Sequence, residues 1–339
     1  MSDLRYINIE NFKINSGRTI SLKLSYQHFG QHHHKAPVVL VNHALTGNSN
    51  VTGQDGWWSD IIGPNKTIDT NYYCVLVFNI PGNGYRNQSE YFTEFYQEFT
   101  ANDIARIFLN GLEHLEISKL HAIIGGSVGG GIAWHLAALK PDLAAHLIPI
   151  ASHWKSSDWL IANCYIQDRL LNNSNNPIAD ARLHAMTLYR TPESFTSKFN
   201  RTKTTQGIFN VESWLNYHGE KLTERFQLSA YKMMNQILKT IDITENEKDF
   251  EEVISRIESN IHIITINSDL FFKAEDSWET FVKIKSLKNE VSIGEIKSIH
   301  GHDAFLIEYQ QLIRFLKPVF NFDKSVKHLD KQNFMKKCS

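Results

Sequence analysis

The residue best suited to chemistry in this sequence is Ser127, which stands in the string Gly125-Gly126-Ser127-Val128-Gly129. A buried-strand pattern precedes the string and a helical pattern follows it. This is the G-x-S-x-G pattern of a tight strand-to-helix turn, which holds one hydroxyl clear of the backbone. The helix would direct its free N–H groups at any charge that forms beside the hydroxyl. Glycine-rich turns also bind phosphates, so the pattern alone leaves both interpretations open.

The phosphate interpretation fits these glycines poorly. No lysine followed by serine or threonine ends the run, so the nucleotide-phosphate loop is missing. The dinucleotide motif needs glycine at the places that Ser127 and Val128 occupy. We therefore interpret Ser127 as a candidate nucleophile.

A serine nucleophile needs a base within hydrogen-bond reach, and a third group must orient that base. In folds with this turn the partners follow in the order serine, acid, histidine. Asp269 follows the apolar run Ile261–Asn267, and His302 follows the apolar run Val291–Ile299. We predict that Ser127 attacks, that His302 moves the proton, and that Asp269 orients the imidazole and stabilises its charged form.

Both partners have competitors in the sequence. Asp158 is an alternative acid, although it lies well past the end of its strand, and Asp269 could instead cap a helix. His300 could act with His302 as a metal-binding pair, but the sequence supplies no obvious third ligand. We prefer His302 as the base because it lies deeper in the loop, beside Gly301.

Acyl transfer also requires donors for a developing oxyanion. The backbone N–H of Val128, directly after the nucleophile, is the first expected donor. The second should come from the loop after Pro37–Asn42, where we select the N–H of Leu45. His43 begins this loop, and a structural histidine that bonds within the loop is its simplest interpretation.

The predicted elements place these residues in an α/β fold. Continuous apolar runs indicate strands buried on both faces, alternating with helical patterns, and two alternating segments indicate an N-terminal hairpin. We therefore expect a mostly parallel sheet with an antiparallel N-terminal hairpin. The predicted strands are Tyr6–Phe12, Thr19–Phe29, Pro37–Asn42, Tyr73–Asn79, Leu120–Ile124, His146–Ile150, Ile261–Asn267 and Val291–Ile299. The predicted helices are Ile104–Leu115, Val128–Leu139, Ser277–Ser286 and Ala304–Leu316.

The interval Trp154–Phe250 is polar, rich in aromatic residues and helical in pattern. A helical insertion here would cover the carboxyl ends of the strands, where such sheets bind ligands. We interpret residues 154–250 as a lid rather than an independent interaction module. Residues 1–153 and 251–322 would form the core, and the lysine-rich residues 323–339 would form a solvated tail.

Composition excludes several classes of protein. A net charge of −1 gives no electrostatic basis for binding nucleic acid or an anionic membrane. Three widely spaced cysteines argue against a disulfide framework, and no apolar signal or membrane-spanning run is found. We expect a soluble, cytoplasmic protein.

The run His32-His33-His34-Lys35 could suggest a metal site. We expect consecutive histidines in a loop to point in different directions, and therefore predict a solvated loop and no bound metal.

Several strings around the candidate residues resemble the homoserine O-acetyltransferase family, acyltransferases of the α/β-hydrolase superfamily. The similarity runs in the same order from His43 to Leu306, which is most of the chain. Its strings are His43-Ala44-Leu45-Thr46-Gly47, Gly56-Trp57-Trp58, Ile62-Gly63-Pro64, Ile124-Gly125-Gly126-Ser127, Tyr189-Arg190, Phe209-Asn210-Val211-Glu212-Ser213-Trp214-Leu215 and Gly301-His302-Asp303-Ala304-Phe305-Leu306.

The resemblance implies an α/β-hydrolase fold with a helical lid and an acyl-CoA-dependent O-acyltransferase activity, most simply on L-homoserine in methionine biosynthesis. It implies a serine-histidine-aspartate triad, with acetyl-CoA or succinyl-CoA as the donor substrate and no permanently bound cofactor. Arg190 would bind the carboxylate of the acceptor and Asp303 its ammonium group. Related enzymes pair through lid helices, so a homodimer is also implied.

Other reactions fit the same resemblance. They are serine or homoserine O-succinyl transfer and ester hydrolysis or deacetylation, since water can resolve the same acyl-serine. A simple esterase has no need of a paired Arg190 and Asp303. A non-catalytic binding protein would have no reason to keep all three triad groups.

The chain departs from the family at three places. The segment Asn79–Ser89 replaces the usual Gly-Gly-Cys and Gly-Ser-Thr-Gly-Pro strings, Val128 replaces a methionine, and Cys164–Ala181 is shorter than usual. The first of these lies near the expected acyl pocket. The acyl chain and the acceptor therefore stay open.

Overall fold

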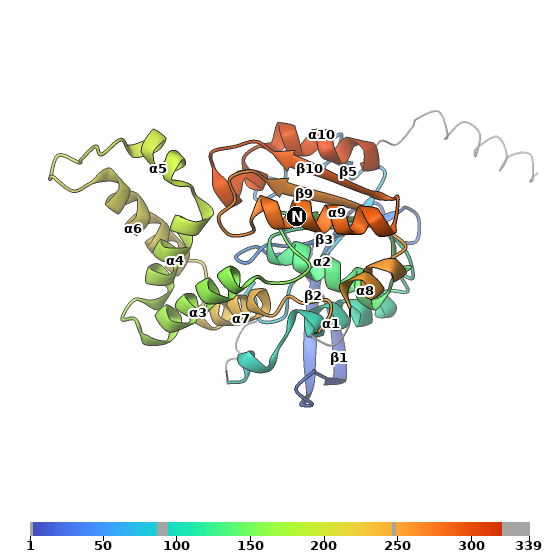
Figure 1. Ribbon diagram of the computed structural model, residues 1–339. Coiled ribbons are helices and arrows are strands. Elements are labelled where there is room, and N and C mark those ends of the chain that lie inside the picture. Colours follow the sequence, from blue (N-terminus) through green and yellow to red (C-terminus); the bar gives the residue numbers. More distant parts are fainter. Residues whose placement is uncertain (1–2, 87–93, 246–248, 321–339) are drawn as a thin grey trace, which may run out of the picture.

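One mostly parallel sheet organises this protein, whose computed structural model describes residues 3–86, 94–245 and 249–320 (Figure 1). In spatial order its strands are β1 (Arg5–Lys13), β2 (Thr19–Gly30), β6 (Cys74–Phe78), β3 (Val38–Asn42), β7 (Leu120–Gly126), β8 (Ala144–Ile150), β9 (Asn260–Ile266) and β10 (Val291–Ile296). The hairpin β1–β2 is antiparallel and β2 joins β6 in antiparallel register, whereas the remaining pairs are parallel. The predicted fold class is confirmed.

Burial follows the position of each strand in the sheet. Every residue of β3 and β6 is buried, whereas β1 alternates between exposed and buried positions. A central parallel strand has apolar contacts on both faces, and an outer hairpin strand keeps one face in water. This difference explains why continuous apolar runs predicted the central strands.

Two apolar layers cover the two faces of the sheet. One layer joins strand residues such as Leu40 to α1 (Ala101–His114), α2 (Val128–Leu139) and α9 (Ala274–Leu287). The other joins Val39 and Val41 to α10 (Tyr309–Phe320) and to the segment 51–68. That segment contains the short strand β4 (Ile62–Gly63), which pairs with β5 (Ile68–Asp69).

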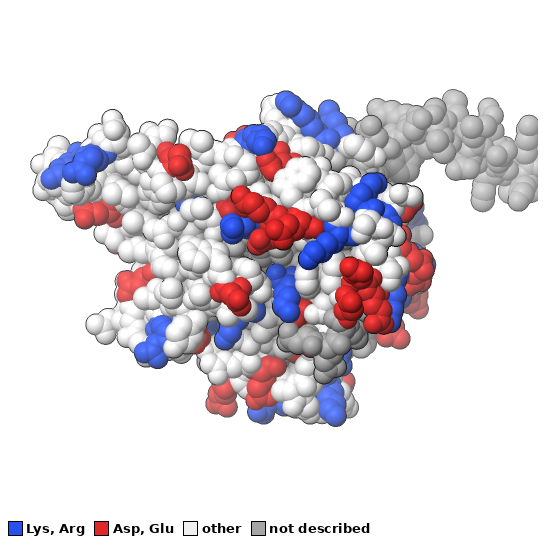
Figure 2. All heavy atoms as spheres, viewed as in Figure 1, with Lys and Arg blue, Asp and Glu red and all other residues white. Residues whose placement is uncertain are grey.

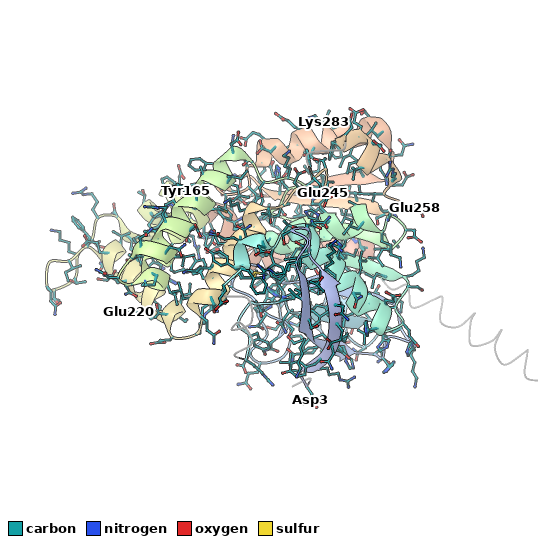
Figure 3. The ribbon with its side chains drawn as sticks, turned by 90° about the horizontal axis from the view of Figure 1, so that it is seen from below. Asp3, Tyr165, Glu220, Glu245, Glu258 and Lys283 are labelled. Atoms are coloured by element: carbon teal, nitrogen blue, oxygen red, sulfur yellow. The ribbon has the colours of Figure 1, made fainter. Side chains whose placement is uncertain are left out.

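A group of helices, here called the insertion, separates β8 from β9 although these two strands are neighbours in the sheet. Its helices are α3 (Asp158–Asn173), α4 (Pro177–Tyr189), α5 (Pro192–Phe199), α6 (Asn210–Thr223), α7 (Leu228–Lys239) and α8 (Phe250–Arg256). Helices α7 and α8 pack on α2, whereas α4 packs on α6. Helices α3 to α6 therefore extend to one side of the sheet, where Figure 3 labels Tyr165 and Glu220, whereas α8 lies against α2 and α9.

The surface and helix lengths add two observations. Figure 2 shows Lys and Arg interspersed with Asp and Glu over the visible face, in line with a net charge of −1. None of the described helices combines the length and apolarity needed to cross a bilayer.

The prediction failed in detail near the end of the chain. The expected helix Ala304–Leu316 is two elements, the 3-10 helix η3 (Gly301–Leu306) and α10, and β10 ends at Ile296. A positive φ of 64° at Gly301 turns the chain into η3, and periodicity does not register such a turn. Strands β4 and β5 were not predicted because each has only two residues, too few for a periodic pattern. The expected tail, 323–339, lies outside the described residues.

Close packing of α2 on β3 yields a stability prediction. A Cβ at Gly129 would lie 2.4 Å from Asn42 O and 2.8 Å from His43 O, both backbone atoms. We expect Gly129→Ala to lower the free energy of unfolding by about 1–3 kcal/mol, as overpacking does. Urea denaturation measures this change.

Gly219→Ala, within α6, is the matched control, because the atom nearest its Cβ, at 2.7 Å, is Cδ1 of the half-buried Leu183, the end of a flexible side chain. It should cost less, since alanine favours a helix over glycine by about 0.5–1 kcal/mol. Equal losses for both variants would contradict the role given to the Gly129 contact.

Candidate active site

Ser127 occupies a strained backbone position between β7 and α2. Its φ is 58° and its ψ is −128°, a backbone conformation that residues other than glycine rarely adopt. Hydrogen bonds fix the turn, since Ser127 N donates to Ile150 O at 2.9 Å and Ser127 O accepts from Gly130 N at 2.9 Å. The surrounding structure therefore presents the hydroxyl at the carboxyl end of the sheet, as a nucleophile turn requires.

The structure brings Ser127, His302 and Asp269 together in one buried chain of hydrogen bonds. The Ser127 Oγ lies 2.9 Å from His302 Nε2, and His302 Nδ1 lies 2.7 Å from Asp269 Oδ2. Because a carboxylate only accepts, His302 Nδ1–H donates to Asp269, which leaves Nε2 to accept from the serine hydroxyl. This arrangement can remove a proton from Ser127 during attack.

The other carboxylate oxygen of Asp269 is held by backbone. Its Oδ1 accepts from Phe271 N at 2.7 Å and from Phe272 N at 2.9 Å. Asp269 thus makes the local turn bonds of the capping interpretation and also reaches His302. The competitor Asp158 is an exposed residue at the first position of α3.

Four aromatic rings surround the imidazole of His302. Their centroids lie 5.2–5.7 Å from its own, and they belong to Tyr189, Phe271, Phe272 and Phe305. Burial raises the pKa of Tyr189 to about 12, so its hydroxyl stays neutral near pH 7. The rings exclude water from the base, and aromatic faces favour a cation when the imidazole is protonated.

The competitor His300 lies in a different environment. Its Nδ1 shares a hydrogen bond with Ser194 Oγ at 3.3 Å, on α5. Within the described ranges, His300 and His302 do not belong to a group of three potential metal ligands.

The two expected oxyanion donors lie in segments that contact each other. Val128 is the first residue of α2, where an N–H has no acceptor within the helix. Leu45 lies in the turn closed by Gly47 N and Ala44 O at 2.9 Å. Gly129 packs against the start of this loop at Asn42 and His43. The role of both amides as donors stays a prediction.

A buried polar network holds this loop, here called the oxyanion loop (43–49), against the segment after β6. His43 Nδ1–H donates to Ala44 O at 2.8 Å, and its Nε2 accepts from Ile80 N at 3.0 Å. Asn79 Oδ1 accepts from Ser49 N at 2.8 Å and from Asn83 Nδ2 at 3.2 Å.

His43 therefore has the structural role that the sequence indicated. Asn79 and Asn83 belong to the segment that departs from the family, and no sequence pattern indicated that they would hold the loop. The described part of that segment ends at residue 86.

Arg190 and Asp303 form an ion pair across the junction of insertion and core. Arg190 Nε lies 3.0 Å from Asp303 Oδ2, without the angles of a hydrogen bond. The pair forms because Tyr189, at the end of α4, packs on η3, where a Cβ at Gly301 would lie 2.8 Å from Tyr189 O. Both side chains stay about one-fifth exposed and can exchange partners with a ligand.

The insertion adds cations that the sequence analysis did not single out. Arg225 Nη1 donates to Thr46 O at 3.2 Å, in the oxyanion loop. Burial, together with the charge of Arg182, lowers the pKa of Arg225, which still carries its charge at pH 7. No local motif marks Arg225, because only the folding of the insertion brings it to Thr46.

A cavity of about 330 Å³ opens beside Arg190. Helices α5 and α6 supply most of its wall, and His300 lies at its edge. Its lining residues are Arg190, Ser194, Phe195, Ser197, Lys198, Phe199, Trp214, His218 and His300.

Comparison with known proteins agrees with this fold. The family described as alpha/beta hydrolase fold matches residues 37–295. A homoserine O-acetyltransferase from Chloroherpeton thalassium is 33% identical over 81% of this chain and 77% of its own length. The chain belongs to the homoserine O-acetyltransferase family of α/β hydrolases.

Solved structures show the same fold at lower identity. The homoserine O-acetyltransferase from Bacillus anthracis has a TM-score of 0.84 at 20% identity and covers 95% of this chain and 98% of its own. Esterase E22 has a TM-score of 0.85 at 18% identity, with coverages of 95% and 100%. A homoserine O-acetyltransferase and an esterase thus share this fold, so the fold alone does not distinguish the two activities.

The expected divergence of the three consecutive histidine side chains is wrong. We expected the side chains of His32, His33 and His34 to diverge, but their ligand nitrogens all lie within 4.8 Å of one another. The chain turns here, with Lys35 N donating to His32 O at 2.8 Å, and the turn brings the three rings together.

Burial of His43 predicts how stability depends on pH. Burial lowers the pKa of His43 from 6.5 to about 4. Between these values the unfolded chain binds a proton that the folded protein does not, so stability is full above pH 6.5 and falls toward pH 4. The loss is roughly 3 kcal/mol, with a slope near 1.4 kcal/mol per pH unit in mid-window.

Urea denaturation between pH 4 and pH 7 measures this slope. We expect His43→Gln to reduce the slope of the free energy of unfolding against pH by the contribution of about one proton. The contributions of the other buried histidines should stay unchanged. An unchanged slope in the variant would show that His43 does not titrate in this way.

Proposed function

We propose that this protein transfers an acyl group, most simply acetyl, from acyl-CoA to the hydroxyl of L-homoserine, in methionine biosynthesis. The observation that carries the proposal is the hydrogen-bonded chain of Ser127, His302 and Asp269. The protein's membership of the homoserine O-acetyltransferase family and the ion pair of Arg190 and Asp303 support this acceptor.

The first half-reaction forms an acyl-serine. Ser127 Oγ attacks the thioester carbonyl while His302 Nε2 takes its proton and Asp269 stabilises the imidazolium. The N–H groups of Val128 and Leu45 would donate to the oxyanion. The C–S bond then breaks, and His302 returns the proton to the leaving thiolate.

The second half-reaction repeats these steps with the acceptor. The acceptor hydroxyl gives its proton to His302 and attacks the acyl carbonyl. The new ester leaves as the Ser127 Oγ–C bond breaks, and the proton passes back to Ser127. Donor and acceptor therefore use one site in turn, which predicts ping-pong kinetics.

The pair of Arg190 and Asp303 suits a zwitterionic acceptor. An α-amino acid can insert its carboxylate toward Arg190 and its ammonium toward Asp303, so that each charge exchanges one partner for another. Because neither charge is left bare in the free protein, binding need not expose an unpaired buried ion. Arg225 and Arg182 add positive potential that favours an anionic ligand at the same junction.

The cavity beside Arg190 supports an acyl-CoA donor. Lys198 can pair with a phosphate, and Trp214 offers a ring on which an adenine can stack. Both groups line the same opening as Arg190.

A serine esterase is the second candidate, because esterase E22 shares the fold and water can resolve the same acyl-serine. The two functions differ in the need for an acceptor. The ion pair of Arg190 and Asp303 favours the transferase, since an ester carries no zwitterion.

Thiol release tests the proposal directly. With acetyl-CoA or succinyl-CoA alone we expect one burst of thiol per active site, and steady release only after homoserine or serine is added. Full-rate release without an acceptor would overturn the transferase proposal in favour of hydrolysis. Ser127→Ala should abolish the burst, whereas Ser213→Ala, an exposed serine on α6, should keep it.

The acceptor site has its own test. We expect Asp303→Asn and Arg190→Gln to raise the KM for the amino acid at least tenfold, because each leaves one substrate charge unpaired, while the donor burst stays near normal. Lys221→Gln, at an exposed lysine on α6, is the control. An unchanged acceptor KM would remove both residues from the acceptor site.

A further inference from the structure

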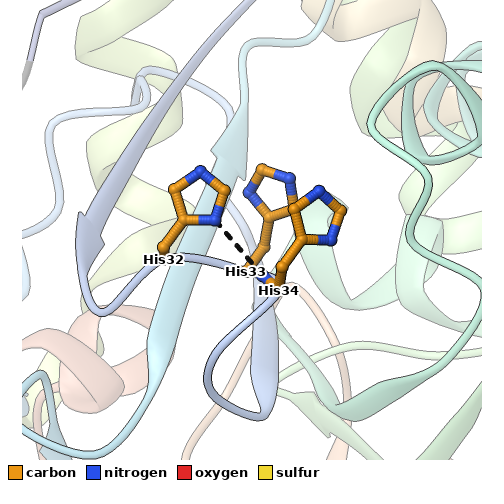
Figure 4. A group of neighbouring side chains, drawn as sticks. All are labelled: His32, His33 and His34. Atoms are coloured by element: carbon orange, nitrogen blue, oxygen red, sulfur yellow. Dashed lines mark hydrogen bonds between the residues drawn. The ribbon is translucent and has the colours of Figure 1, made fainter.

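We propose that the turn after β2 is a binding site for one divalent transition-metal ion, held by the imidazoles of His32, His33 and His34. The site lies in the loop between β2 and β3 and shares no residue with the triad. Figure 4 shows the three rings on the same side of the turn.

The three rings already form a compact group. The centroids of His32 and His33 lie 4.2 Å apart, those of His33 and His34 also 4.2 Å, and those of His32 and His34 5.3 Å. Their ligand nitrogens lie within 4.8 Å of one another. On a tetrahedral zinc with bonds of about 2.1 Å, two such nitrogens lie about 3.4 Å apart. Side-chain rotation alone can close this gap because His32 and His34 are exposed.

The backbone beneath these rings is fixed at both ends. Gln31 N donates to Tyr73 O at 3.1 Å, and Cys74 N donates to Pro37 O at 3.0 Å. The turn itself is closed by Lys35 N and His32 O at 2.8 Å. A ligand set on a fixed turn loses little backbone entropy when it binds.

The ligand nitrogens are available to a metal. The backbone N–H of His34 donates to His32 Nδ1 at 3.3 Å, a long hydrogen bond that a metal can replace.

The donor set defines the class of ion. Imidazole nitrogen suits zinc, copper and nickel, whereas magnesium and calcium require oxygen ligands. Three imidazoles leave at least one coordination position for water, so one chain can complete the site.

Titration calorimetry of the full chain with zinc chloride tests the proposal. We expect saturable binding of one ion per chain, and no binding when magnesium chloride replaces zinc. The double variant His32→Asn/His34→Asn should bind zinc at least tenfold more weakly. His114→Gln, at an exposed histidine on α1, should bind like the natural chain.

Thermal unfolding gives a second readout that does not depend on activity. Zinc should raise the melting temperature of the natural chain and of His114→Gln but not of the double variant, because an ion that binds only the folded state stabilises it. Equal melting temperatures without metal would show that the double variant folds. Undiminished zinc affinity in the double variant, or one ion per two chains, would overturn the proposal.

Discussion

The site depends on one strained residue. Ser127 holds a positive φ between a buried strand and a buried helix, and such a conformation persists only when the surroundings determine it completely. The glycines on either side allow the turn to close, since a Cβ at Gly125 would lie 2.4 Å from backbone atoms of Gly129. The parallel sheet, α2 and the loop after β3 thus meet at the point where the hydroxyl emerges.

The same close approach ties the oxyanion loop to the nucleophile. Gly129 contacts the start of that loop, and hydrogen bonds of His43, Asn79 and Asn83 join the loop to the segment after β6. Since this network is buried, each polar group needs its partner, and a change at one position leaves another unsatisfied. The segment after β6 therefore fixes the position of the oxyanion loop through hydrogen bonds.

Sequence patterns predicted the parts of this protein that repeat a local rule. Continuous apolar runs predicted the central strands, and the order of serine, acid and histidine after successive strands located three residues that meet in space. Features built from distant segments were beyond such rules. Arg225 reaches Thr46 only through the path of the insertion, and the rings of His32, His33 and His34 converge because of a turn that has no periodic signal.

The position of the insertion also has a meaning for synthesis of the chain. Ser127 precedes the insertion, whereas Asp269 and His302 follow it, so roughly 140 residues separate nucleophile from acid in the order of translation. A nascent chain that ends within the insertion carries a serine without its base. The hydrogen-bonded chain of Ser127, His302 and Asp269 can therefore form only after η3, which follows β10, has been synthesised.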